Sequence, residues 1–191
     1  MAKISDYRGG VTDAYYAEIT ETPDSNGGIK IEYGTPAVLG GTASINVSHE
    51  KGENKVYESD VMIRNISHVS GANIEYQSRS VDQATEMKLI YGLEESDTGD
   101  YMFGPEDKPK PVAFGYAHSR TNGGYDAYWY LYTMPSASDE SAETATENET
   151  TPTRTYNFGA IPSPENQKMA RFKVCKDRAE LNAFFASVLP A

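Results

Sequence analysis

The stretch that decides the fold is Thr-Ala-Ser-Ile-Asn-Val-Ser-His at residues 42–49, in which polar and apolar side chains alternate. Strict alternation is typical of a β-strand with one buried face and one face in water. Residues 153–161 repeat the pattern, with Tyr156 and Phe158 on the apolar face. In both stretches the polar face is small and smooth. On an antiparallel sheet, such a face suits a surface past which another molecule slides better than a pocket that holds a ligand.

Further strands are predicted on both sides of these two stretches. Runs rich in β-branched and aromatic residues, separated by turn residues, are typical of strands. The runs lie at residues 14–20, 29–34, 61–66, 69–77, 111–119, 125–133 and 169–175. The connections between them are too short for the helical crossovers that a parallel sheet needs. We therefore predict a mainly β fold with short helices, as an antiparallel β-sandwich or open barrel with a helix packed on it.

Two short helices are predicted from their N-terminal capping signals. Ser80 and Gln83 are spaced as a capping box for the first helix. Asp177 and Glu180 are spaced in the same way before the second, which we expect to run over about 178–188. Both helices carry an apolar stripe at helical spacing, and we therefore expect each to pack on the sheet.

Composition and charge limit the classes of protein that this chain can belong to. Its 191 residues suffice for a single domain, residues 1–191, whereas two domains would be cramped. The net charge of −11 argues against a protein that grips nucleic acid or an anionic membrane, since both need clustered Lys and Arg. One cysteine, Cys175, rules out an intramolecular disulfide. We see no signal peptide and no apolar run that could span a membrane, and expect a protein made in the cytoplasm.

Polar segments between the predicted strands are expected to project from the domain. Residues 49–60 are charged and predict a long protruding arm. We expect this arm to be a loop with a short β-like centre. Residues 134–152 are acidic and poor in hydrophobic side chains, which predicts a solvated loop. Residues 94–111 are rich in acidic side chains, glycine and proline, and also predict a loop.

The strand predicted at 125–133 is apolar on both of its faces, and a strand of this kind is covered on both sides. We expect its own domain to cover one face and another molecule the other. The candidates for such an interface are Tyr128, Trp129, Tyr130 and Tyr132. Tyrosine and tryptophan suit this role because each joins a large apolar body to a polar tip.

No pattern of catalytic or metal-binding residues stands out. His49, His68 and His118 lie on separate elements at no ligand spacing, and are expected to be structural. Cys175 has no histidine beside it and is better explained as a buried thiol than as a nucleophile. No phosphate-binding or hydrolase motif is found. We therefore expect a structural or binding role, no cofactor, no metal and no enzymatic activity.

The order of several segments along the chain carries a family resemblance. These segments are YYAEIT at 15–20, YGTPAVLGGTASINVS at 33–48, VYESD at 56–60, GANIEYQ at 71–77, VDQATEMKLIYG at 81–92, VAFGYAHSRTNGGYDAYWYLYT at 112–133 and TPTRTYNFGA at 151–160. In this order they resemble the phage major tail protein family, which forms the tail tubes of long-tailed bacteriophages with non-contractile tails. Each motif alone is weakly specific, but together they cover nearly the whole chain.

The resemblance implies a structural virion protein with a tail tube protein-like fold. Six subunits would close into a ring whose sheets join into one β-barrel around a lumen, and the rings would stack into a tube. Its partners would be further copies of the chain, the tape-measure protein, the tail terminator and distal tail or baseplate proteins. Double-stranded DNA would pass through without specific binding, and no membrane would be involved. The protein would lie in the virion tail after assembly in the host cytoplasm.

Two sets of residues acquire roles from this resemblance. The polar faces described above become candidates for the lumen surface, although an ordinary solvent-facing surface explains them equally well. These candidates are Thr42, Ser44, Asn46, Ser48, Thr153, Thr155 and Asn157. The arm becomes the candidate for ring-to-ring stacking, through mixed charges that could fix the register of neighbouring rings. Its candidates are Glu50, Lys51, Glu53, Asn54, Lys55, Tyr57, Glu58 and Asp60.

Other functions remain open. A soluble ligand-binding β-barrel would need an apolar stripe through the interior of many strands. An adhesion domain at a cell surface would need an export signal. The inner tube of a contractile injection machine, including type VI secretion, follows the same fold logic, and only the order of the motifs favours the non-contractile tail.

Overall fold

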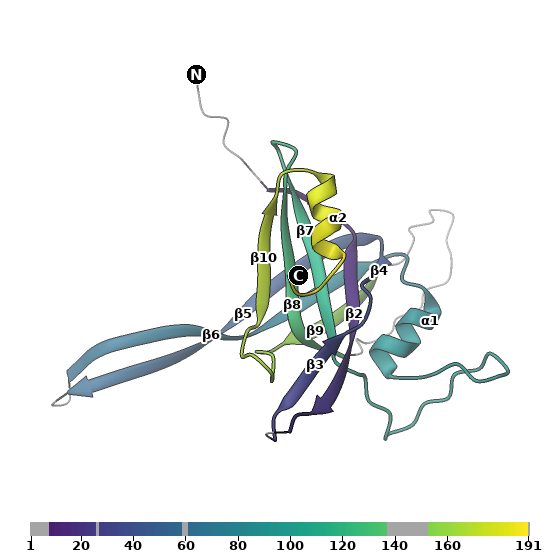
Figure 1. Ribbon diagram of the computed structural model, residues 1–191, viewed down its shortest axis with the longest axis horizontal. Coiled ribbons are helices and arrows are strands. Elements are labelled where there is room, and N and C mark those ends of the chain that lie inside the picture. The colour runs from purple at the N-terminus through teal and green to yellow at the C-terminus, as the bar shows by residue number, and fades with distance from the viewer. Residues whose placement is uncertain (1–7, 26, 59–60, 137–152, 191) are drawn as a thin grey trace.

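The computed structural model describes residues 8–25, 27–58, 61–136 and 153–190, with only the backbone described at 54–58 and 61–66 (Figure 1). Its strands form an antiparallel sheet, and its two helical segments are short. The strands are β1 Arg8–Val11, β2 Ala14–Pro23, β3 Ile29–Tyr33, β4 Ala37–Gly40, β5 Thr42–Glu58, β6 Val61–Ser78, β7 Val112–Arg120, β8 Tyr125–Ser136, β9 Arg154–Ala160 and β10 Ala170–Cys175. The helical segments are α1 Gln83–Glu86, continued by the π-helical turn η1 Met87–Tyr91, and α2 Arg178–Phe185. The predicted mainly β fold is confirmed.

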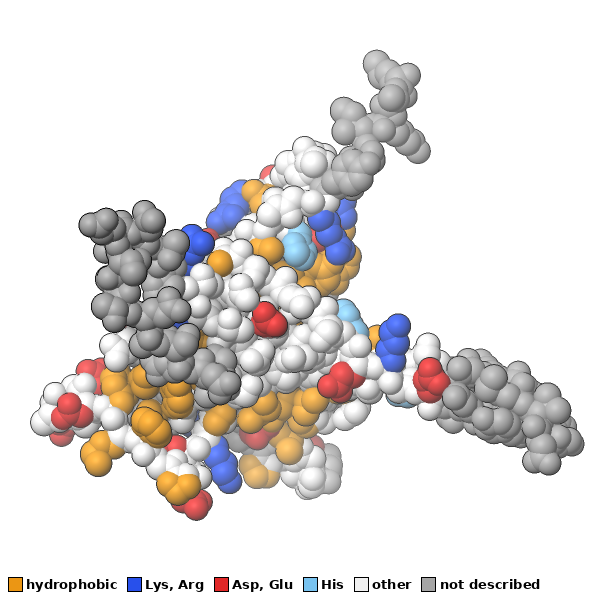
Figure 2. All heavy atoms as spheres, turned by 180° about the vertical axis from the view of Figure 1, so that it is seen from behind, with side chains coloured by type: hydrophobic (Ala, Val, Ile, Leu, Met, Phe, Trp, Pro, Cys, Tyr) orange, Lys and Arg blue, Asp and Glu red, His pale blue; other side chains and the backbone are white. Residues whose placement is uncertain are grey.

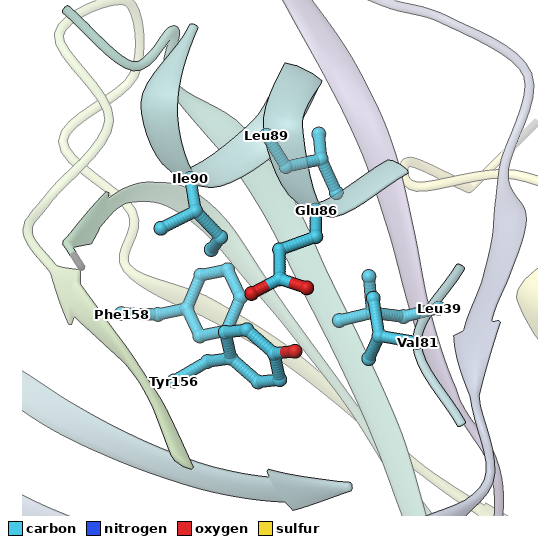
Figure 3. A pocket seen from close by; sticks show the side chains of 7 residues that line it. All are labelled: Leu39, Val81, Glu86, Leu89, Ile90, Tyr156 and Phe158. Carbon is cyan, nitrogen blue, oxygen red and sulfur yellow. The ribbon is translucent and has the colours of Figure 1, made fainter. Parts of the chain in front are cut away.

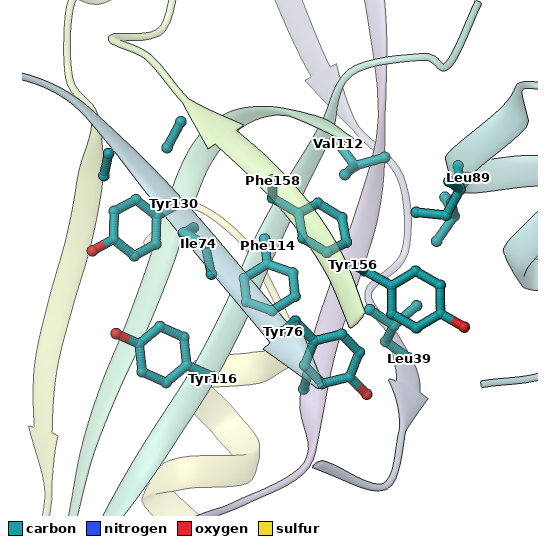
Figure 4. Packing of buried hydrophobic residues seen from close by; sticks show 14 residues of the cluster. Leu39, Ile74, Tyr76, Leu89, Val112, Phe114, Tyr116, Tyr130, Tyr156 and Phe158 are labelled. Atoms are coloured by element: carbon teal, nitrogen blue, oxygen red, sulfur yellow. The ribbon is translucent and has the colours of Figure 1, made fainter. Parts of the chain in front are cut away.

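The main path of the sheet runs β3-β2-β7-β8-β9-β6-β5, with β1 beside β7, β4 beside β2 and β10 beside β8. The sheet folds over, so that β5, β6 and β9 face β2, β7 and β8 across a core rich in aromatic rings (Figure 4). Phe114 of β7 lies at the centre, with its ring centroid 4.6 Å from that of Phe158 and 5.7 Å from that of Tyr76. The alternation in the sequence therefore placed the apolar faces of these strands correctly.

A second core lies on the opposite face of β7 and β8, where α2 covers the sheet (Figure 1). Small residues on β7, Ala113 and Ala117, leave room there for Trp129 and for the apolar side of α2. Trp129 is fully buried, and its indole N–H donates a hydrogen bond to the carbonyl oxygen of Phe184 at 3.4 Å. The second cover of the strand at 125–133 is thus a helix of the same chain.

The two helices differ in how well their capping signals predicted them. Asp177 accepts a hydrogen bond from the backbone N–H of Glu180 at 2.9 Å, as predicted for α2. The cap predicted for α1 was wrong, because Asp82 is its N-cap and accepts from the N–H of Thr85. Ser80 is engaged elsewhere: its Oγ accepts a hydrogen bond from the N–H of Gly41, just before β5.

The arm predicted as a loop at 49–60 is instead part of a long β-hairpin. β5 and β6 pair from Thr42 opposite Ser78 out to Glu58 opposite Val61. β9 pairs with β6 only as far as Ala72, so beyond this point the two hairpin strands pair only with each other among the residues that the structure describes. We define the arm as residues 50–58 and 61–71, and Figure 1 shows it projecting far from the body.

Candidate functional site

The polar faces predicted from two separate stretches come together on the outer side of the folded sheet. Three neighbouring strands form this surface, with β6 between β5 and β9. Ser44 lies opposite Gln77 of β6, which lies opposite Thr155 of β9. We call the surface the polar face and define it by its outward residues, which are Ser44, Asn46, Ser48, Asn73, Glu75, Gln77, Thr155 and Asn157.

Hydrogen bonds between side chains hold part of the polar face in place. The Ser44 hydroxyl donates to Oε1 of Gln77 at 2.9 Å, and Nε2 of Gln77 donates to Oε1 of Glu75 at 3.1 Å. These bonds tie the amide and the carboxylate down along the strand, so the surface stays low and smooth. Figure 2 shows a broad, mostly uncharged area at the centre of this side of the molecule.

Three members of the polar face come from β6 and were missed by the sequence reasoning. Asn73, Glu75 and Gln77 alternate with Ile74 and Tyr76, which are fully buried. That alternation is visible in the sequence, and it could have identified the three residues once β6 was placed between β5 and β9. The order of strands in the sheet was the missing information.

Two of the predicted lumen residues, Thr42 and Thr153, lie outside the polar face. The register of β5 shifts between Thr42 and Ser44, and a bulge of this kind turns one side chain to the other face of the sheet. The Thr42 hydroxyl is buried as a result, so the prediction was wrong for this residue. Thr153 lies just before β9 at the margin, where its hydroxyl accepts a hydrogen bond from Nε of Arg79 at 3.5 Å.

The aromatic residues predicted to face another subunit are mostly buried by their own chain. Trp129 is covered by α2, and Tyr130 lies in the central core. Tyr132 is buried against β2 and β3, with its hydroxyl donating to the Glu21 carboxylate at 2.8 Å. Burial raises the pKa of Tyr132 to about 12. The interface prediction is therefore wrong for these three, and only Tyr128 remains partly exposed.

The arm carries exposed charge where its side chains are described. Glu50, Lys51 and Glu53 are exposed on β5. The backbone of the arm strands beyond them is paired, which places Asn54, Lys55, Tyr57 and Glu58 along β5. Asp60 lies outside the described residues, as do positions 137–152 of the predicted acidic loop. The first residues of that loop were assigned wrongly, because β8 continues to Ser136 and pairs there with Asn157.

One apolar pocket lies at the open end of the sandwich, between α1, η1 and β9 (Figure 3). It leaves no room for a water molecule among its lining side chains, which are Leu39, Val81, Glu86, Leu89, Ile90, Tyr156 and Phe158. The Glu86 carboxylate is almost fully buried there and forms an ion pair with Arg154 of β9. Burial next to this carboxylate raises the pKa of Tyr156 to about 12. The site therefore serves to fix α1 on the sheet.

Titratable groups elsewhere show no catalytic arrangement within the described ranges. These ranges hold no group of three or more His, Cys, Asp or Glu side chains placed to bind a metal ion. Cys175 is fully buried, and burial raises the pKa of its thiol, which disfavours the thiolate. His118 packs edge-on against the Tyr116 ring at 5.4 Å, and burial lowers the pKa of its imidazole.

Comparison of the chain with models of known protein families finds no match, and comparison with curated proteins finds no significant match. Among the helices that the structure describes, none is long and apolar enough to cross a membrane.

Proposed function

We propose that this chain is the tail tube subunit of a long, non-contractile phage tail. Six copies would close into a ring, and stacked rings would form a hollow tube around the tape-measure protein. The same tube would later conduct the genome. The order of the sequence motifs suggests this function, and two features of the fold support it.

The observation that carries the proposal is the arm. Beyond Gly71 the strands β5 and β6 pair with no third strand in the described part of the chain. An isolated two-stranded hairpin is at best marginally stable in water, and its open edges are templates for pairing with another chain. A hairpin of this length therefore makes physical sense as an element that another copy covers. In a stacked assembly the neighbouring ring would supply that cover.

The polar face gives the second support. DNA moves freely along a surface only if no cluster of Lys or Arg holds its phosphates. The polar face carries hydroxyl and amide groups together with one carboxylate, that of Glu75. A ring with this face turned inward would present DNA with a smooth, slightly acidic wall.

Negative-stain electron microscopy of the full-length protein tests the proposal directly. Samples are compared fresh and after concentration at raised salt, which screens repulsion between subunits of net charge −11. Rings or tubes with a central hole are the expected result. Sedimentation analysis of the same samples measures the oligomeric state in solution. A single monomeric species at every concentration and salt, with and without pre-formed tail initiator complexes, would contradict the proposal.

A further inference from the structure

An exposed apolar pair stands out on the loop between η1 and β7. Met102 is 87% exposed and Phe103 is 73% exposed, the highest values among the large hydrophobic side chains described. Exposed apolar groups of this size are typical of contact surfaces when they occur together. The ring of Phe103 leans against Tyr91 of η1 at 5.9 Å between centroids, which fixes one side of the pair on η1.

Hydrogen bonds within the loop hold the segment that carries this pair in a defined conformation. Its N-terminal turn is closed by a hydrogen bond from the N–H of Ser96 to the carbonyl oxygen of Asp100 at 3.0 Å. The N–H of Gly104 donates to the Asp107 carboxylate at 2.8 Å. The segment between residues 93 and 111, which contains the pair, carries six carboxylates and two lysines. We call residues 93–111 the acidic knob.

A second apolar surface lies on β10, next to β8. Phe172 is 52% exposed and Val174 is 45% exposed, and both lie on the same side of the strand. The Phe172 ring contacts that of Tyr128 at 4.9 Å, which stacks on the buried Tyr116 at 5.2 Å. The aromatic core thus continues to the surface at this edge. We call Tyr128, Phe172 and Val174 the aromatic shelf.

The charge beside the aromatic shelf is opposite to that of the acidic knob. Arg8 and Arg120 both form ion pairs with Asp126, which is buried, so one carboxylate serves two guanidinium groups. Nε of Arg8 lies 3.1 Å from the Asp126 carboxylate, and its Nη2 donates to the Tyr128 hydroxyl at 2.8 Å. Two guanidinium groups, those of Arg8 and Arg120, therefore lie beside the exposed rings.

We propose that the acidic knob of one copy docks on the aromatic shelf of the next. Met102 and Phe103 would cover Phe172 and Val174, while the carboxylates of the knob face the arginines. In Figure 2, apolar groups with acidic neighbours lie at the lower left and apolar groups bordered by Lys, Arg and His at the upper right, at opposite ends of the face shown. A contact between unlike surfaces is head-to-tail, and repeats until a ring closes or a filament grows. This inference rests on the proposed function, because the contact is the one that would join neighbouring subunits of the ring.

Cysteine cross-linking between two single variants tests the contact. Met102→Cys and Phe172→Cys proteins are mixed and mildly oxidised, and the disulfide-linked peptides are identified by mass spectrometry. The native Cys175 is fully buried and does not compete. Docking raises the effective concentration of the two thiols, so we expect the mixed disulfide to form roughly tenfold faster than random collision allows. The matched control replaces Phe172→Cys with Val38→Cys, which is 54% exposed and lies on β4, away from the shelf.

The outcomes separate this contact from the proposed function. Equal rates for positions 172 and 38 would overturn the contact, and would leave the tail tube proposal standing if the wild-type protein still forms rings. A selective 102–172 disulfide in a protein that forms open filaments would confirm the contact and contradict the ring. Selective cross-linking together with rings supports both.

Discussion

Gly115 on β7 lies directly beneath the indole of Trp129. A Cβ atom at position 115 would approach the indole ring carbons to within 2.7 Å, which is closer than such atoms come in proteins. The indole is locked between the sheet and α2 and has nowhere to move. We expect Gly115→Ala to lower the free energy of unfolding by about 1–3 kcal/mol, as overpacked cores do. Urea denaturation of the purified variant measures this loss.

Gly104→Ala is the matched control for this variant, because a Cβ atom at position 104 meets nothing within 4 Å. Its free energy of unfolding should stay near that of the wild type. Equal stability of the two variants would mean that the indole is not fixed above position 115.

Buried tyrosines make the stability of this protein sensitive to alkaline pH. Burial raises the pKa of Tyr132 and Tyr156 from 10 to about 12, so the unfolded chain loses these protons first as pH rises. The contribution of each group to stability is complete below pH 10, and it is lost progressively between pH 10 and about 12. We expect Tyr132→Phe to show a shallower fall in melting temperature over this range. A fall as steep as in the wild type would contradict the role of this hydroxyl.

Residue-level prediction from the sequence succeeded where a regular strand sets the direction of a side chain. Ser44 and Asn46 point outward as the alternation requires, and Val112 and Phe114 point inward. The prediction for Thr42 was wrong because a bulge shifts the register of β5, and nothing in the local sequence signals that bulge. The interface prediction for Trp129 was wrong because the sequence shows that both strand faces are apolar, but not that α2 of the same chain covers one of them.

The arm shows what limits prediction at the level of an element. Strands are recognised by an apolar face that alternates with a polar one, and residues 50–58 show no such alternation in the sequence. Residues 50–58 therefore resemble a charged loop, although the backbone pairing with β6 continues through them. The fold class was predictable because every other strand packs on a core. The length of the hairpin was not.

Shortening the arm should separate folding from assembly. We would replace residues 52–68 with an Asn-Gly turn, which joins Lys51 to Val69, a pair that already faces across the hairpin. Within the described strands, the removed segments pair only with each other, so the free energy of unfolding should change by less than about 1 kcal/mol. Rings should no longer stack into tubes, as judged by electron microscopy. Tubes of normal length from this variant would exclude the arm as the stacking element.

At the scale of the whole molecule, the orientation of the polar face in the assembly is the feature with most consequence. If this face lines the tube, cations placed on it would hold DNA inside. We expect the triple variant Asn46→Lys, Asn73→Lys and Asn157→Lys to form tubes that trap short duplex DNA present during assembly. For phosphate contacts of this kind, the logarithm of the binding constant falls linearly with the logarithm of the salt concentration. We therefore also expect the DNA to be released at raised salt.

Protection from nuclease distinguishes the inside of the tube from its outside. DNA held within the lumen of the triple variant should survive digestion, whereas DNA bound to an outer surface should be cut. The matched control carries three lysines on the β2–β3 hairpin, at Thr20, Thr22 and Ser25, far from the polar face in the sheet order. Its DNA should bind and be digested. Complete digestion in both variants would place the polar face on the outside of the tube and leave the lumen to another part of the sheet.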